Sequence, residues 1–402
     1  MRQKRIVITG LGVVSSIGIG KDAFWDSLIN GKSGISKVDA FDTSDHFTHY
    51  GGQIRNFKAE EFIDKKKVRM MAKASHLAIA STKLALKDSG YNINEEEAKR
   101  VAVVFGTTGG EAQEIEEIDA VFVKKGKDAV DNWSIIQYPV NNISANVSKE
   151  LKIKGPNRMF TTACAAGNYA LGCAFDFIKL GKADCAIVGG ADAFSYLSFT
   201  GFNQVRAVAP EICQPFDKNR KGMIPGEGSG ALILETLESA RKRGVFIYAE
   251  ILGYGLSCDA KHMTNPDAAG IAKCMKNALV KAKLKPSMID YISAHGTGTR
   301  FNDRAECAAI KRVFKQEKIA VSSIKSMLGH TMGAASAIES ISCCLAIKNK
   351  ILPPTINYET PDPECDIDCV PNNARKQNIN IAINNGFAFG GNNCSVIFKR
   401  FS

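Results

Sequence analysis

Short apolar runs of strand length alternate with longer segments of helical periodicity, and this alternation is the strongest constraint on the fold. Residues 101–105 and 185–188 are continuous apolar runs that each end in glycine, as buried strands do. Residues 68–88 repeat apolar side chains at three- and four-residue steps, and Gly90 follows them as a helix cap would. Strands and helices at these intervals predict an α/β fold with parallel or mixed sheets.

The pattern of predicted elements starts a second time near residue 249. Each half of the chain ends in a strand, a glycine-rich turn and a further strand. We therefore expect two similar halves, 1–248 and 249–402, that pack together as one unit. The repeated pattern comprises strands at 247–252, 289–294, 319–322, 379–383 and 395–398, and helices at 271–282 and 333–347.

The composition argues against several classes of protein. Twelve cysteines without Cys-x-x-Cys spacing favour free thiols in a reducing compartment over a disulfide framework or a zinc site, so no metal is expected. Gly10, Gly12 and Gly18 interrupt the first apolar run, which predicts a first strand rather than a signal peptide. No apolar run is long enough to span a membrane, and a cytoplasmic protein is expected.

The net charge of +11 is compatible with nucleic acid, an anionic membrane surface or an acidic protein as partner. The basic residues are scattered over lysine-rich helix faces without the interleaved aromatic side chains of a stacking surface. A nucleic-acid partner is therefore not expected, and no membrane association is predicted.

Cys164 is the leading candidate for a nucleophile. A strand-like segment, residues 159–162, leads directly into it, and a helical pattern begins at once and ends near Gly181. Cys164 is therefore expected at a helix N-terminus, where free N–H groups and the helix dipole favour an anion and lower the pKa of a thiol. Its immediate neighbours are alanines and a glycine, which leaves room for a ligand beside the sulfur.

Two histidines stand where α/β proteins bind ligands. His295 follows a predicted strand on a glycine-rich loop, and His330 precedes a small-residue helix start at Gly333. A cysteine protease uses one histidine as a base, with an Asn or Asp to orient it. Two neutral histidines that donate N–H bonds to one carbonyl oxygen suit a different task, the stabilisation of an enolate.

Asp303 and Glu306 open an amphipathic helix and have two interpretations. In a capping box, Asp303 caps the helix and Glu306 reaches back to it. Alternatively, Glu306 pairs with Lys325, a lysine in an otherwise apolar, glycine-containing segment, and fixes its charge near the site. Residues 384–393 form a strand-ending glycine turn. This turn is either a simple hairpin or a loop whose N–H groups face an oxyanion and whose aromatic side chains gate an apolar tunnel.

A nucleotide-binding interpretation of the first turn is weak. Gly10-Leu-Gly12 after the first strand resembles the start of a dinucleotide-binding fingerprint, but Ser15 stands in the place of the third glycine. A nicotinamide-dependent reductase is therefore not favoured.

The whole chain resembles the β-ketoacyl-acyl-carrier-protein synthases, the elongating condensing enzymes of the thiolase fold, and most closely their type II branch. This resemblance implies a thiolase-like α/β fold with two pseudo-symmetric halves in five α-β-α-β-α layers, usually in a dimer. The motifs that carry it, in the family's order, are Val7-Ile-Thr-Gly-Leu-Gly, Thr161-Thr-Ala-Cys-Ala-Ala-Gly, Pro215-Phe-Asp-Lys, Gly226-Glu-Gly-Ser-Gly, Ala294-His-Gly-Thr-Gly-Thr, Lys325-Ser-Met-Leu-Gly-His, Leu352-Pro-Pro-Thr-Ile-Asn and Gly386-Phe-Ala-Phe-Gly-Gly.

The resemblance implies a role for each of the leading candidates. Cys164 corresponds to the nucleophile that accepts the acyl chain, and the N–H groups of Cys164 and Phe389 correspond to the oxyanion hole. His295 and His330 correspond to the pair that binds the malonyl thioester carbonyl and stabilises the enolate left by decarboxylation.

Other positions match the supporting parts of the family's site. Lys325 and Glu306 match a charge pair, and Asp303 matches a helix-start position near it. The positions that match the acyl-pocket loop, the contacts to the phosphopantetheine arm and the gate are Thr108, Thr297, Thr299, Phe387 and Phe389.

The resemblance implies no metal or bound cofactor, because the phosphopantetheine arrives on an acyl carrier protein. Since acyl carrier proteins are acidic, the basic surface gains an expected partner. The residues that match the family's docking patch are Lys65, Lys66, Lys67, Arg69, Lys124, Lys125, Lys127 and Arg206.

Several departures from the family pattern concern the acyl substrate. Ala165 and Ala166 replace the usual Thr-Ser after the nucleophile, and the loop at Thr108 lacks the bulky aliphatic side chain of fatty-acid elongases. Three interpretations stay open: fatty-acid elongation, a ketosynthase subunit that builds a polyketide or polyene chain with a chain-length partner, and a partner subunit without turnover. The dimer is accordingly expected to be a homodimer or a heterodimer with a related subunit.

Overall fold

An 11-stranded mixed sheet made of two similar halves forms the centre of the computed structural model, which describes residues 4–315 and 319–401. In the first half the strand order is β1 (Ile6–Ser15), β8 (Gly228–Thr236), β7 (Cys185–Asp192), β5 (Val101–Gly106) and β6 (Asn157–Phe160). In the second half the order is β9 (Ala249–Cys258), β15 (Asn392–Lys399), β14 (Ile381–Phe387), β10 (Tyr291–Ser293) and β11 (Ala320–Ser322).

The two halves of the sheet have the same strand directions. In the first half, β1–β8 and β8–β7 are antiparallel while β7–β5 and β5–β6 are parallel. In the second half, β9–β15 and β15–β14 are antiparallel while β14–β10 and β10–β11 are parallel. The halves join where the start of β1 pairs with the start of β9. This agreement supports a division of the chain near residue 248, which stays a prediction.

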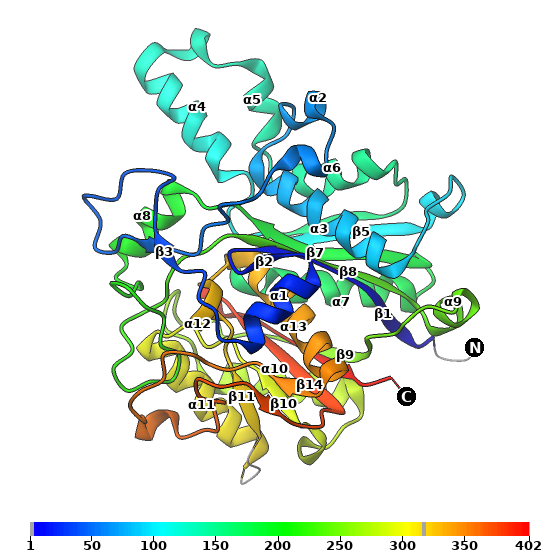
Figure 1. Ribbon diagram of the computed structural model, residues 1–402, viewed down its shortest axis with the longest axis vertical. Coiled ribbons are helices and arrows are strands. Elements are labelled where there is room, and N and C mark those ends of the chain that lie inside the picture. The colour runs from blue at the N-terminus through cyan, green and yellow to red at the C-terminus, as the bar shows by residue number, and fades with distance from the viewer. Residues whose placement is uncertain (1–3, 316–318, 402) are drawn as a thin grey trace.

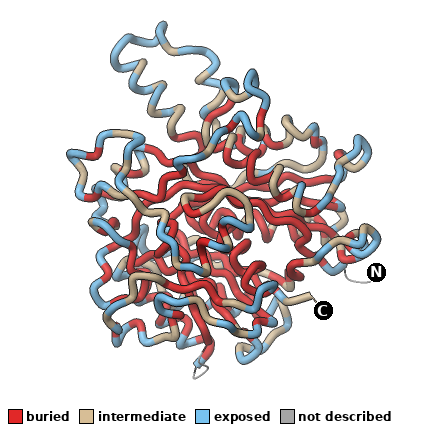
Figure 2. Tube along the Cα trace, viewed as in Figure 1, coloured by how far each residue is buried: buried red, intermediate tan, exposed pale blue. Residues whose placement is uncertain are grey.

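Helices lie between the two halves of the sheet and on both outer faces (Figure 1). The central pair, α7 (Ala166–Lys179) and α13 (Ala335–Asn349), packs against strands of both halves. One outer layer contains α3 (Lys73–Ser89) and α6 (Asn142–Leu151), and the other contains α10 (Ala268–Ala282) and α11 (Arg300–Phe314). The predicted α/β fold with two pseudo-symmetric halves in five layers is thereby confirmed, and Figure 2 shows the inner layers as the buried core.

The two central helices begin in the same way. A single 3₁₀ turn precedes each of them, η4 (Ala163–Ala165) before α7 and η6 (Met332–Ala334) before α13. The first residue of each turn has a positive φ, 47° at Ala163 and 51° at Met332, a conformation that costs energy for residues other than glycine. Both turns lie where the two halves of the molecule meet, and the functional site is built around them.

The structure differs from the sequence-based predictions mainly between β5 and β6. The helix predicted over 68–88 begins at Lys73, because a short separate helix, α2 (Lys65–Val68), comes before it. Helices α4 (Ala112–Lys125) and α5 (Asn132–Gln137) were not predicted, and they form an arm that projects from the layers (Figure 1). We call residues 112–138 the arm.

The remaining helices and strands surround this core. They are α1 (Lys21–Ile29), α8 (Tyr196–Gln204), α9 (Leu237–Arg243), α12 (Lys325–Leu328), β3 (Ser36–Lys37), β4 (Tyr50–Gly51), β12 (Ile351–Leu352) and β13 (Arg375–Lys376). The eleventh strand of the central sheet, β2 (Gly18–Ile19), pairs with the end of β1. Within the described ranges, no helix has the length and apolar character needed to cross a membrane.

Candidate active site

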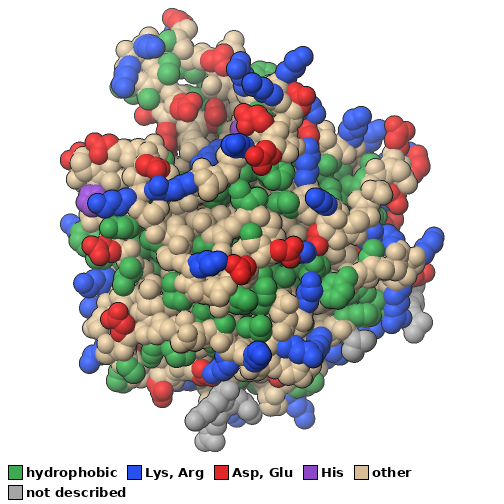
Figure 3. Space-filling view, viewed as in Figure 1, with side chains coloured by type: hydrophobic (Ala, Val, Ile, Leu, Met, Phe, Trp, Pro, Cys, Tyr) green, Lys and Arg blue, Asp and Glu red, His purple; other side chains and the backbone are tan. Residues whose placement is uncertain are grey.

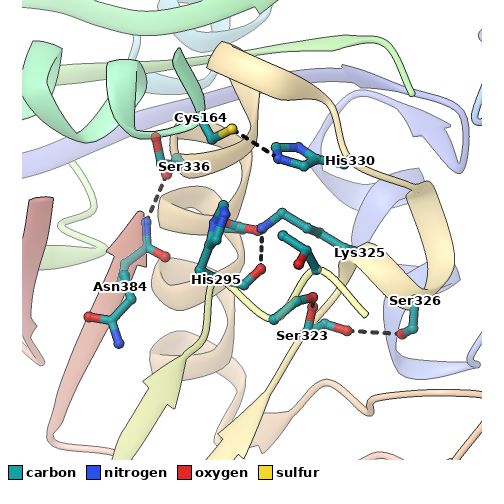
Figure 4. Close-up of polar contacts among 12 residues, drawn as sticks. Cys164, His295, Ser323, Lys325, Ser326, His330, Ser336 and Asn384 are labelled. Atoms are coloured by element: carbon teal, nitrogen blue, oxygen red, sulfur yellow. Dashed lines mark hydrogen bonds and ion pairs between the residues drawn. The ribbon is translucent and has the colours of Figure 1, made fainter. Parts of the chain in front are cut away.

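Cys164, His295 and His330 come from three separate segments and meet in one buried cavity. Cys164 lies in η4, His295 follows β10, and His330 precedes η6. Cys164 Sγ lies 3.1 Å from His330 Nε2, and the two histidine rings lie 5.5 Å apart and nearly perpendicular (Figure 4). All three side chains line a cavity of about 200 Å³. The structure therefore brings together the nucleophile and the two histidines that the sequence singled out.

The hydrogen bonds of His330 fix which of its ring nitrogens carries the proton. The backbone N–H of Met332 donates to His330 Nδ1 at 3.0 Å, so Nδ1 is an acceptor. A neutral ring then holds its proton on Nε2, which points at the sulfur of Cys164. His330 is consequently a hydrogen-bond donor toward the cavity.

Both histidines are held in the neutral form. Burial, together with the nearby charge of Lys325, places the pKa of His295 and of His330 well below the usual histidine value. Nδ1 of His295 is buried and accepts or donates no hydrogen bond within the described structure. Two uncharged imidazoles therefore face the cavity.

The pKa of Cys164 differs in direction from the prediction. The helix start was expected to lower it, but complete burial of the thiol raises the pKa to about 11. Lys325 and the backbone N–H groups of Cys164 and Phe389 act in the opposite direction without overcoming burial. The role of these two N–H groups as an oxyanion hole stays a prediction.

Lys325 pairs with Glu339, so the predicted pairing with Glu306 is wrong. Lys325 Nζ bonds to the carboxylate of Glu339 from α13 and donates to the carbonyl oxygen of His295 at 2.7 Å. Glu306 instead accepts hydrogen bonds from the backbone N–H groups of His295 and Gly296, at 2.9 and 2.8 Å. Both carboxylates stabilise the segment that carries His295, one through Lys325 and the other directly.

The predicted capping box at Asp303 and Glu306 is also wrong. Helix α11 begins at Arg300, so Asp303 lies inside its first turn rather than before it. The buried carboxylate of Asp303 accepts from the backbone N–H groups of Phe216 and Gly298, at 2.9 and 3.2 Å. Asp303 thereby holds the glycine loop that follows His295.

The predicted substrate-binding residues surround the same cavity. Thr108, Thr297, Thr299, Phe387 and Phe389 all line it. The hydroxyl groups of Thr297 and Thr299 lie 2.9 Å apart, and Phe387 is buried near His295. The side chain of Phe389 is 38% exposed at the mouth.

Several residues of the cavity wall were missed by the sequence analysis. Among them are Phe202, whose ring lies 6.4 Å from that of Phe389, and the neighbouring residues His262 and Met263. The segment that contains them is tied to the gate loop, because Gly390 N–H donates to the carbonyl oxygen of Met263. Its sequence has no periodicity or motif that predicts this position.

The predicted docking residues lie on the surface, and the structure separates them into groups. Lys65, Lys66, Lys67 and Arg69 are exposed in or beside α2, where Figure 3 shows basic side chains gathered near the base of the arm. Lys124, Lys125 and Lys127 are exposed at the far end of α4. Only Arg206 lines a cavity next to the mouth, together with Lys221 and Arg300.

Cys164, His295 and His330 also form the one group in the described residues with the geometry of a metal site, since their donor atoms lie within 4.8 Å of one another. Metal binding at His330 Nε2 requires the proton to move to Nδ1, where it would meet the N–H of Met332. This donor pattern suits an oxygen ligand better than a cation. The expectation that the chain holds no metal stays a prediction.

Comparisons with known proteins agree with this geometry. Residues 3–240 match the model of the β-ketoacyl synthase N-terminal domain, and residues 248–359 match that of the C-terminal domain. The 3-oxoacyl-[acyl-carrier-protein] synthase 2 of Synechocystis sp. is 40% identical over 100% of this chain and 99% of its own length.

Two solved structures superimpose on the full length of both chains. The ishigamide ketosynthase/chain length factor matches with a TM-score of 0.97 and 40% identity. The type II ketosynthase AntDE, in complex with its acyl-carrier protein AntF, matches with a TM-score of 0.91 and 33% identity. This chain belongs to the β-ketoacyl synthase family.

Proposed function

We propose that this protein is a β-ketoacyl-acyl-carrier-protein synthase, an acyltransferase that joins a malonyl unit to a cysteine-bound acyl chain by decarboxylative Claisen condensation. The observation that carries the proposal is the fixed tautomer of His330, whose Nε2–H points into the cavity beside Cys164. A protease-type base would need a lone pair on Nε2 to accept the proton of the thiol. The neutral ring of His330 has its lone pair on Nδ1, where it accepts the N–H of Met332.

The first step loads the enzyme. The sulfur of Cys164 attacks the thioester carbonyl of an acyl chain bound to its carrier protein. The thiol of the carrier protein leaves with the proton that the cysteine loses. The N–H groups of Cys164 and Phe389 stabilise the oxyanion, since both face the sulfur. The product is an acyl-cysteine in a mainly apolar cavity.

The second step makes the carbon nucleophile. Malonyl-carrier enters the cavity with its thioester oxygen against the N–H groups of His295 and His330, and its carboxylate leaves as CO₂. The two neutral imidazoles stabilise the enolate without protonating it, because the pKa of each is held far below 6.5. The enolate carbon then attacks the acyl-cysteine carbonyl, the C–S bond breaks, and the thiolate of Cys164 takes a proton from water.

Separate assays of loading and decarboxylation test this mechanism. We expect Cys164→Ser to abolish the acyl adduct detected by intact-mass spectrometry, whereas Cys173→Ser, at a half-buried position of α7, retains it. Replacing His330 by Ala is expected to reduce CO₂ release from malonyl-carrier at least ~100-fold while loading continues. Wild-type protein that neither loads nor decarboxylates, even with a partner subunit present, refutes the proposal.

An acidic acyl carrier protein is the proposed partner, and it delivers the phosphopantetheine arm in place of a resident cofactor. The exposed basic groups on α2 and α4 support this, as does Arg206 beside the mouth. Charge reversal with Lys66→Glu and Arg69→Glu is expected to raise the KM for carrier substrates at low salt. Lys285→Glu, also exposed, is the control. If the charge-reversed protein and the Lys285→Glu control have equal KM values at low salt, the docking proposal is refuted.

A second subunit is proposed to cover the arm, in a homodimer or in a heterodimer with a related chain. The arm exposes large apolar side chains that a lone chain leaves in water, such as Phe122, Trp133 and Ile136. Ile136→Asp is expected to yield monomers in native mass spectrometry, while Asp128→Ala, an exposed polar position of the arm, leaves the assembly intact.

The pathway has two candidates, fatty-acid elongation and type II polyketide or polyene synthesis. The small side chains beside Cys164 and the absence of a bulky aliphatic residue at Thr108 favour the second. The very close match to a ketosynthase/chain length factor is a further observation in its favour. A partner subunit without turnover is disfavoured, because Cys164, His295 and His330 are all in place. Loading from a panel of saturated and polyene acyl-carriers distinguishes the two pathways.

A cytoplasmic location is proposed as well. All 12 cysteines are free in the structure, as expected in a reducing compartment.

A further inference from the structure

Asp192 is a buried carboxylate that holds two active-site loops together. It is the last residue of β7 and is 1% exposed. On one side it accepts hydrogen bonds from Thr107 Oγ1, Thr108 N and Gly109 N, at 2.8, 2.9 and 2.8 Å. On the other side it accepts from Gly333 N at 2.7 Å. One side chain thus joins the loop after β5 to the turn before α13.

The turn held by Asp192 is the one that fixes the tautomer of His330. The N–H of Met332 donates to His330 Nδ1, and the next N–H along the chain, that of Gly333, donates to Asp192. Met332 between them has a φ of 51°, which a residue other than glycine keeps only if its neighbours enforce it. The carboxylate is the group that holds the peptide immediately after this residue.

The contact between the two loops is also a close backbone contact. A Cβ at Gly333 would lie 2.4 Å from the carbonyl carbon of Thr107, so no other side chain fits there without displacing the loop. Thr108, the next residue of that loop, lines the same cavity as the two histidines. A shift of this loop would therefore displace the turn beside His330.

We propose that Asp192 is a positioning residue for the decarboxylation step. It holds the Met332–Gly333 turn so that His330 keeps its proton on Nε2 and aims it at the substrate carbonyl. Asp192 does not line the cavity, and it acts through the backbone that it binds. This inference rests on the proposed function, because it assigns a task within the same reaction.

A carboxylate is the appropriate group at this position because all its partners are donors. Asp192 faces one hydroxyl and three backbone N–H groups. An asparagine would turn its own NH₂ group toward at least one of them, leaving two donors face to face. These donors also lower the pKa of Asp192, which burial raises to about 6, so the side chain is ionised at pH 8.

The test is Asp192→Asn, with loading and decarboxylation measured separately on the full-length protein at pH 8. We expect kcat for CO₂ release from malonyl-carrier to fall about 10–100-fold, by analogy with the loss of a group that orients a metal-binding histidine. Acyl loading of Cys164 is expected to fall less than about 3-fold, because the hydrogen bonds of Asp192 go to the loop after β5 and to the Gly333 turn, and none goes to the turn that holds Cys164. In ¹⁵N spectra of histidine-labelled protein, the His330 signal should change from one tautomer to a mixture.

Asp217→Asn is the matched control. Asp217 is also fully buried, and its carboxylate also accepts from backbone N–H groups, those of Asn219, Glu359 and Thr360, at 2.6–2.7 Å. It lines no part of the catalytic cavity. We expect a comparable loss of stability, with the His330 signal and the ratio of decarboxylation to loading unchanged.

Three results would overturn the inference: wild-type decarboxylation in Asp192→Asn, an equal loss of loading and decarboxylation, or an unchanged His330 signal. If Asp192→Asn does not fold, Thr107→Val removes one donor and keeps the carboxylate. This variant should lower decarboxylation about 2–5-fold at constant loading, as expected for one neutral hydrogen bond, and no change would again overturn the inference. Failure of the wild-type protein in both assays would instead refute the proposed function.

Discussion

Breaking the buried ion pair of Lys325 and Glu339 tests how much this pair contributes to the stability of the protein. The two side chains are 1% and 3% exposed, and Lys325 Nζ also donates to the carbonyl oxygen of His295 at 2.7 Å. Lys325→Met keeps most of the side-chain volume but leaves the carboxylate without its cation. Removing one partner of such a pair costs about 3–5 kcal/mol of unfolding free energy, because the remaining charge is buried and uncompensated.

A second substitution separates the charge effect from the loss of packing. Adding Glu339→Gln to Lys325→Met removes the uncompensated charge, so the double variant should regain about 1–3 kcal/mol, a common coupling energy for residues in contact. The free energy of unfolding is measured by urea denaturation at pH 8. Burial raises the pKa of Glu339 to about 7 against the lowering effect of Lys325. At pH 6 the single variant should therefore lose less stability, because the carboxyl group binds a proton instead.

The exposed pair of Lys99 and Glu96 supplies the control. Lys99→Met removes a lysine of the same kind from a solvated ion pair and is expected to leave the unfolding free energy unchanged. A cost of less than about 1 kcal/mol of unfolding free energy for Lys325→Met at pH 8 would contradict a buried, uncompensated charge. A further loss of unfolding free energy on adding Glu339→Gln would contradict it as well.

Three further predictions concern the cavity. In NMR titrations, His295 and His330 should stay neutral as the pH falls through 6.5, because burial and Lys325 hold the pKa of both well below that value; a midpoint near 6.5 contradicts this. Alkylation of Cys164, followed by peptide mass spectrometry, should keep rising with pH toward its pKa of about 11, and a plateau below pH 9 argues against the burial effect. Thr297→Val and Thr299→Val should each raise the KM for malonyl-carrier about 2–10-fold with little change in kcat, the effect of one lost neutral hydrogen bond. A fall in kcat at constant KM would assign these hydroxyl groups to the chemical step instead.

The placement of Cys164 could be predicted from sequence, whereas its pKa could not. The strand end and the helix start around it are local patterns that a short window contains. Its burial comes from distant segments, among them the one that carries His330, whose Nε2 lies 3.1 Å from the sulfur. Because no local pattern reports that burial, the expected lowering of the pKa had the wrong sign.

The partner of Lys325 was missed although the sequence contained a signal. Glu339 is the only charged residue in the small and apolar run 333–347, and a lone charge inside a buried helix needs a partner. Glu306 was chosen instead because it lies in a recognisable motif. Asp192 at the end of a buried strand carried a comparable signal, but its four donors come from loops that only the fold brings together.

The arm shows the other limit of prediction from sequence. Ile115, Ile118 and Phe122 follow helical spacing, so α4 itself was predictable. An amphipathic pattern implies that the apolar face is covered, but it does not say by which chain. The exposure of Phe122, at 54%, emerges only when the rest of the molecule is in place.

Although the two halves have the same architecture, only the first half has room for a nucleophile at the turn before its central helix. Cys164 is the middle residue of the turn before α7, and Gly333 is the middle residue of the matching turn before α13. A side chain at Gly333 would collide with the backbone of Thr107, so the second half cannot hold a nucleophile at the equivalent place. In the proposed mechanism the second half instead supplies His295, His330 and Lys325, which act on the acyl group held by Cys164 in the first half.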